Sequence, residues 1–199
     1  MRRDILVTMR RDFDPHFRLL GFLPLLFFAG QTVHYWRFGG LGNLLWMCNT
    51  GNLLMAAGLF LGHRELIRAA AIWTIPGLGI WLWYVARDAN LSSTLAHVGG
   101  VIVGMIALRR VRMDRVAWIY AFAWSLLLQI VARLFTDPAL NVNLAHGIQP
   151  GWESIFSSYW KFRLTLSLLI ALTLWLLGKA LQWLWPADDQ IVKEISQVA

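Results

Sequence analysis

The sequence has few acidic residues and one cysteine, and each shortage argues against a class of protein. Cys48 has no second cysteine to form an intramolecular disulfide with, so it is either a packing residue or a reactive thiol. Only 11 Asp and Glu residues occur, and none lies within a long apolar segment. Proton-coupled transport and dinuclear metal chemistry usually place carboxylates in the membrane, so both are disfavoured. Internal repeats and low-complexity tracts are also absent from the sequence.

Apolar residues dominate what is present. Hydrophobic residues make up 58% of the 199 residues, and 12 are tryptophan. A soluble domain of this composition would aggregate, whereas lipid suits it as a solvent. The net charge of +7 sits in short clusters between apolar runs. This pattern is typical of membrane topology and argues against a nucleic-acid partner.

Six apolar segments are long enough to cross a bilayer as helices. They are residues 19–36, 43–61, 69–86, 91–108, 116–135 and 164–185. We therefore predict an all-α polytopic helical membrane protein with about six transmembrane helices. Its predicted parts are a basic cytoplasmic or interfacial arm (1–18), the six-helix domain (19–185) and a polar cytoplasmic tail (186–199).

The basic residues predict the orientation. On the side of the N-terminus are Arg2, Arg3, Arg10, Arg11, Arg18, Arg64, Arg68, Arg109, Arg110, Arg112, Arg115, Lys179 and Lys193. On the other side are Arg37, Arg87, Arg133, Lys161 and Arg163. Because Lys and Arg accumulate on the cytoplasmic side, we expect both termini to be cytoplasmic.

Polar residues within the predicted spans lie mainly in their outer halves. Cys48 and Asn52 are one helical turn apart, as are Ser93 and His97 on another span. Cys48 and His97 are each expected roughly 8 to 10 Å below the outer boundary, so they can meet if their helices are neighbours. Gln129 also falls in an outer half.

These residue types suggest acyl transfer. A cysteine needs a base to become a nucleophilic thiolate, the base needs an orienting group, and an acyl oxyanion needs a hydrogen-bond donor. Cys48 and His97 are the predicted catalytic pair, and the oxyanion or orienting residues come from Asn49, Asn52, Ser93 and Asn143. Arg133 and Arg37 are predicted to bind a lipid headgroup.

Structural roles account for the same residues. A cysteine in an apolar helix is often packing filler, and His97, Asn49 and Asn52 can serve as hydrogen-bonding glue between helices. Arg133 can extend its side chain to the outer headgroups. Residues 141–147 can form a turn, where Asn and Gly are favoured for backbone reasons.

Two resemblances can be stated from these motifs. Trp46–Asn49, Ser93 to His97, and Asn141 to Gly147 resemble motifs of an uncharacterised group of bacterial six-span membrane proteins. That resemblance covers most of the chain and implies a multi-pass protein of the bacterial inner membrane. More distantly, Cys48 and His97 match by helix and depth the nucleophile and histidine of the six-helix intramembrane acyl hydrolases and acyltransferases, which include the androgen-induced hydrolases.

Three functions follow as hypotheses. The first is a thiol-dependent acyl hydrolase or acyltransferase that acts on a lipid ester from the outer leaflet, with membrane lipids as partners and without a metal or cofactor. The second is a non-catalytic membrane subunit that binds a lipid, a quinone, a partner helix, or a haem or pigment through His34, His97 or His146, alone or as a homo-oligomer. The third, a small-solute transporter, has little support because the inner halves of the spans are apolar.

Overall fold

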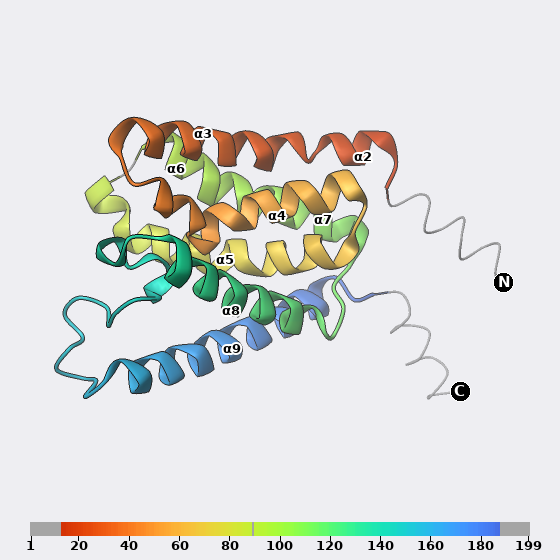
Figure 1. Ribbon diagram of the computed structural model, residues 1–199. Coiled ribbons are helices and arrows are strands. Elements are labelled where there is room, and N and C mark those ends of the chain that lie inside the picture. The colour runs from red at the N-terminus through yellow and green to blue at the C-terminus, as the bar shows by residue number, and fades with distance from the viewer. Residues whose placement is uncertain (1–12, 89, 188–199) are drawn as a thin grey trace, which may run out of the picture.

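The computed structural model describes residues 13–88 and 90–187 and consists of helices joined by turns (Figure 1). The elements are α2 (Pro15–Leu19), α3 (Phe22–Phe38), η1 (Leu41–Leu45), α4 (Met47–Leu61), α5 (Arg64–Asp88), α6 (Leu91–Thr94), η2 (Leu95–Gly99), α7 (Gly100–Val111), α8 (Ala117–Phe135), η3 (Pro138–Leu140), η4 (Val142–Leu144) and α9 (Tyr159–Leu184).

Five segments are long and apolar enough to cross a membrane. They are Pro15–Phe38, Arg64–Trp83, Leu91–Val111, Ala117–Phe135 and Tyr159–Leu184, and the shorter α4 is also apolar. The prediction of an all-α polytopic membrane protein is therefore confirmed. Residues 1–12 of the predicted arm and 188–199 of the predicted tail lie outside the described residues, and residues 15–18 of the arm form most of α2.

Several predicted helix ends were wrong. The helix predicted over 43–61 begins at Met47, because Trp46 has an extended ψ of 136° and the preceding residues form the short 3-10 turn η1. Gly62, with a φ of 67°, ends α4, and α5 then starts at Arg64 rather than at residue 69. Ser158 caps α9 through a hydrogen bond from the Lys161 amide, so this helix starts at Tyr159 rather than at residue 164.

Successive long helices run in alternating directions, so their connections gather at two ends of the bundle (Figure 1). We call the end with the α4–α5 and α7–α8 turns the proximal end and the opposite end the distal end. Both ends of the described chain are proximal, since Asp14 pairs with Arg110 and the Met113 amide donates to the Trp185 carbonyl. Among the described residues, Arg64, Arg68 and Arg110 of the larger basic group lie at this end. The cytoplasmic orientation of the proximal end stays a prediction of the positive-inside rule.

The core lies where α4, α5 and α7 meet. Gly58 of α4 lies against Ile67, and Gly104 of α7 lies against Ala71 and Met55. Small residues let the helix backbones approach closely, which is how membrane helices gain packing contacts. On the other side of α5, Trp73 donates its indole N–H to the Ala121 carbonyl of α8 at 2.8 Å.

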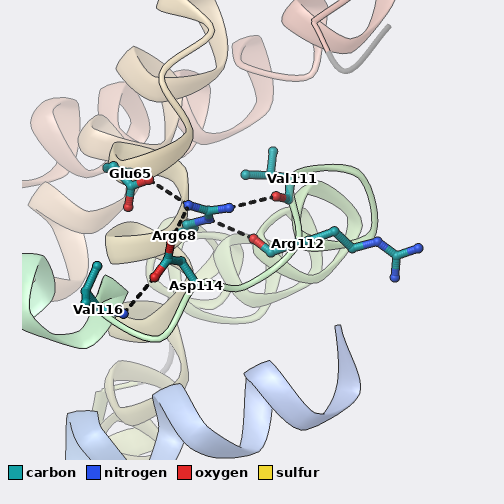
Figure 2. Close-up of polar contacts among 6 residues, drawn as sticks. All are labelled: Glu65, Arg68, Val111, Arg112, Asp114 and Val116. Atoms are coloured by element: carbon teal, nitrogen blue, oxygen red, sulfur yellow. Dashed lines mark hydrogen bonds and ion pairs between the residues drawn. The ribbon is translucent and has the colours of Figure 1, made fainter. Parts of the chain in front are cut away.

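A buried arginine ties the proximal turns together (Figure 2). Arg68 is only 5% exposed; its Nε donates to the Arg112 carbonyl at 2.8 Å and its Nη2 to the Val111 carbonyl at 3.2 Å. Its Nη1 lies 2.6 Å from Glu65 Oε1 and 3.6 Å from Asp114 Oδ2. Arg68 therefore satisfies the last carbonyls of α7 and joins α5 to the α7–α8 turn.

Asp14 gives the proximal end a pH dependence. The pKa of its carboxyl is lowered, first because the Phe17 amide donates to it at 2.7 Å and second because Arg110 donates to it at 2.7 Å. A carboxyl with a lowered folded-state pKa stabilises the fold fully above its unfolded-state pKa of about 4, and this contribution is lost as the pH falls through the folded-state value.

We expect Asp14→Asn to lower the thermal midpoint at neutral pH. At a pH below the folded-state pKa of the Asp14 carboxyl, we expect the substitution to leave the midpoint unchanged. Asparagine keeps an N-cap acceptor but removes the charge that binds Arg110. Thermal unfolding of both proteins in detergent from about pH 7 to about pH 3 measures the effect, in a window set by the ordinary carboxyl pKa. A difference in midpoint that does not change with pH would contradict this assignment.

Candidate functional site

The distal loop, residues 136–158 between α8 and α9, holds the first turn of α4, which carries Cys48. The Asn143 side chain accepts from the Met47 amide at 3.1 Å and donates to the Leu45 carbonyl at 2.7 Å. It thereby takes the place of a missing N-cap side chain on α4. Asn143 was predicted as an orienting or oxyanion residue; the contacts it makes position the helix start next to Cys48.

Asn52 joins α4 to the segment that carries His97. Its Nδ2 donates to the Cys48 carbonyl at 3.0 Å and to the Ala96 carbonyl at 2.9 Å. Both amide hydrogens are used in this way, so Asn52 has only its oxygen, Oδ1, left to offer, and this atom is buried without a hydrogen-bond partner. Asn52 Oδ1 lies 2.7 Å from where a Cβ on Gly100 would be, which explains a glycine there.

Asn49 keeps a free donor. It is 1% exposed, and its Nδ2 donates to the Asn43 carbonyl at 3.0 Å. One amide hydrogen therefore remains, and Asn49 Oδ1 is buried without a partner. Of the predicted oxyanion residues on α4, Asn49 is the one whose contacts leave a hydrogen-bond donor for a ligand.

His97 lies in the π-helical segment η2, between α6 and α7. Its Nδ1 is 2.8 Å from the Ser93 carbonyl, which can only accept, so Nδ1 carries the proton and Nε2 is left as an acceptor in the neutral ring. The orienting contact from Ser93 is therefore made by its backbone. Single-turn π-helical segments occur often at functional sites.

Cys48 and His97 approach the same side of α5. The Cβ of Cys48 is 3.3 Å from where a Cβ on Gly77 would be, and the His97 ring stacks on Trp81 with centroids 5.6 Å apart. Gly77 and Trp81 are one turn apart on α5. Within residues 13–88 and 90–187, no hydrogen bond joins Cys48 Sγ to the His97 ring.

Gln129 of α8 adds a third buried amide side chain, after those of Asn49 and Asn52. It is 2% exposed, and neither its Oε1 nor its Nε2 has a hydrogen-bond partner. α5 and α8 run in the same direction and are joined by the Trp73–Ala121 hydrogen bond. Gln129 is eight residues beyond Ala121 and Trp81 eight beyond Trp73, so both lie about 12 Å further along their helices.

We call Cys48, Asn49, Asn52, Trp81, His97 and Gln129 the distal polar layer. Buried polar atoms without a partner occur on Asn49, Asn52, Trp81 and Gln129. Each such atom costs free energy inside a membrane protein, so several of them at a similar depth are a reason to expect a ligand with its own donors and acceptors. The sequence placed Gln129 in the outer half of its span but gave it no role, and it gave Trp81 none in a site.

The remaining predicted residues lie elsewhere at the distal end. His34 packs against the rings of Tyr35 and Phe38 on its own helix. His146 lies 3.2 Å from Thr136 Oγ1 and 3.3 Å from the Ala132 carbonyl, so its Nε2 holds the loop to the end of α8. Arg37 is exposed at the end of α3.

Arg133 is the predicted headgroup residue that makes ordered contacts. Its Nη1 donates to the Ala145 carbonyl at 2.6 Å, and its guanidinium lies over the Tyr159 ring, 5.4 Å from the centroid. This places it at the junction of α8, the distal loop and α9. Arg163, which the sequence analysis gave no role in a site, belongs to the same junction.

Among the described residues, no three His, Cys, Asp or Glu side chains form a group that could hold a metal ion. Comparisons with protein-family models, with curated proteins and with solved structures found no match.

Proposed function

We propose that the protein is an intramembrane thiol-dependent acyl hydrolase or acyltransferase that takes a lipid ester from the distal side. The observation that carries the proposal is the position of His97. Its Nδ1 is held by the Ser93 carbonyl, and its Nε2 is left as an acceptor. Its ring stacks on Trp81, one turn along α5 from Gly77, whose Cβ position faces Cys48. The proposal places the distal side at the outer face of a bacterial inner membrane.

The reaction would use one ester carbonyl between the two side chains. His97 Nε2 takes the Cys48 thiol proton, and the sulfur attacks the carbonyl carbon to give a tetrahedral oxyanion. The remaining N–H of Asn49 donates to that oxyanion. Collapse breaks the bond to the leaving alcohol, which receives the proton from His97. Water or a second lipid alcohol then cleaves the thioester by the reverse sequence, and no cofactor is needed.

The test uses the fact that Cys48 is the only cysteine in the chain. Purified protein is incubated with p-nitrophenyl palmitate, and acyl adducts are detected by intact mass before and after treatment with neutral hydroxylamine, which cleaves thioesters. We expect one hydroxylamine-sensitive adduct in the wild type and none in Cys48→Ala. In His97→Ala we expect the acylation rate to fall by at least about 100-fold, the usual cost of losing a general base.

His63→Ala is the matched control, because His63 is an exposed histidine at the proximal α4–α5 turn. We expect this variant to acylate at the wild-type rate. Undiminished release of p-nitrophenol by Cys48→Ala would rule out the thiol mechanism.

A second candidate is a subunit that binds a lipid or quinone in the distal polar layer without chemistry. The observation in its favour is Gln129, whose buried amide has no partner at either end. Protein purified from its own membranes would then carry a stoichiometric lipid or quinone that Gln129→Leu loses and Cys48→Ala keeps. A visible absorption band that His97→Ala abolishes would instead indicate a haem or pigment, and absence of any co-purified ligand would count against this candidate.

A further inference from the structure

Two arginines of different helices converge at the distal end. Arg133 is in the last turn of α8, and Arg163 is one turn after Tyr159 at the start of α9. The Tyr159 hydroxyl donates to the Ala145 carbonyl at 2.6 Å and is 3.4 Å from Arg133 Nη1. Tyr159 and the loop carbonyl therefore hold the Arg133 guanidinium in one orientation.

The Arg163 guanidinium is less well satisfied. Its Nη1 is buried and has no hydrogen-bond partner. The Arg133 guanidinium lies over the Tyr159 ring, and Arg163 follows Tyr159 by one turn of α9, so the two like charges share this junction. A buried donor without a partner and a like-charge neighbour both raise the free energy of the folded protein, so this arrangement calls for an anion.

Acidic side chains of the described chain do not supply that anion. Among residues 13–88 and 90–187, no ion pair is formed by Arg133 or by Arg163. Two acids of the distal loop are used locally: Asp137 accepts from the Ala139 amide, and Glu153 accepts from the Gly151 amide. The compensating charge would therefore come from a bound molecule.

We propose that Arg133, Tyr159 and Arg163 form a binding site for a phosphate group. Two guanidinium groups offer planar pairs of N–H donors that match phosphate oxygens, and the Tyr159 ring supports one of them from below. The N-terminus of α9 adds a favourable dipole. This inference rests on the proposed function only in naming the substrate class, a phospholipid rather than a neutral ester, and the site itself is tested by binding alone.

The experiment is native mass spectrometry of the full chain in detergent with added dioleoyl phosphatidylglycerol, and separately with dioleoylglycerol, which lacks the phosphate. We expect phosphatidylglycerol to bind and dioleoylglycerol not to, with affinity for the former at least tenfold lower in Arg163→Gln. Lys161→Gln is the matched control, because it removes a charge from an exposed residue two positions away on α9. We expect it to bind within about twofold of wild type, as for a solvent-exposed charge.

Inorganic phosphate provides the second arm. If millimolar phosphate displaces phosphatidylglycerol and binds by itself with the same Arg163→Gln loss, the site takes soluble phosphate; if only the phospholipid binds, the source is the headgroup. Equal phosphatidylglycerol binding by wild type and Arg163→Gln overturns the proposal, as does equal binding of dioleoylglycerol. If Arg163→Gln does not fold, Arg133→Lys is the second test variant. It keeps the positive charge but loses the paired N–H donors of the guanidinium, so we expect it to bind phosphatidylglycerol less tightly than wild type. Failure here leaves Cys48 acylation untouched, so the two proposals fail separately.

Discussion

Replacing Arg68 with alanine is expected to lower the free energy of unfolding by about 3–5 kcal/mol, the usual cost of breaking a buried charge pair. The variant would leave Glu65, whose Oε2 already lacks a partner, without its cation. It would also leave the Val111 and Arg112 carbonyls at the end of α7 without their donor. Unfolding of the detergent-solubilised protein, followed by circular dichroism, measures the loss.

Arg110→Ala is the control for this prediction, because Arg110 also pairs with an acid at the proximal end but is 49% exposed. An exposed ion pair contributes about 0–1 kcal/mol. Arg68→Lys should fall between the two variants, since one ammonium group cannot reach both carbonyls and Glu65 together. Equal losses in Arg68→Ala and Arg110→Ala would show that the contacts of Figure 2 do not stabilise the fold.

Gly58→Ala is expected to be the most damaging single-methyl change. Overpacking should lower the free energy of unfolding by at least about 1–3 kcal/mol. The new Cβ would lie 2.8 Å from Ile67 Cγ1 and 2.9 Å from the Ile67 backbone nitrogen. The backbone contact cannot be relieved by a rotamer change, so α4 and α5 would have to separate.

Gly79→Ala makes the matched control. Gly79 is also in a helix, but a Cβ there would have no heavy atom within 4 Å. We expect this variant to be unchanged or more stable by up to about 1 kcal/mol, because alanine favours a helix over glycine. Thermal unfolding of the two variants side by side tests the α4–α5 contact, and similar midpoints would contradict it.

The fold class could be predicted because apolar runs of membrane length leave a chain few alternatives. Helix ends could not, since they depend on local geometry such as the extended Trp46 and on caps such as Ser158. The start of α4 depends on Asn143, which is 96 residues away from Met47 in sequence. A contact of that separation has no periodic signal in a single sequence.

The candidate site was predicted in part. The sequence predicts similar depths for Cys48 and His97. It does not reveal that Asn52 donates both amide hydrogens to backbone carbonyls, or that Ser93 contacts His97 through its backbone carbonyl. Gln129 interrupts an apolar run and Arg163 immediately precedes one, and that was the available signal for them. Their significance depends on unpartnered atoms, which only the packed structure reveals.

The shortness of α4 has a consequence for the surrounding lipid. Its 15 residues rise about 22 Å, against a hydrocarbon thickness of about 30 Å. The difference is made up at the distal end by the turn η1 and the loop that Asn143 anchors, which are irregular backbone rather than continuous helix. We therefore expect headgroups and water to approach Cys48 more closely than a mid-membrane residue of α9, and a thicker bilayer to reduce that approach.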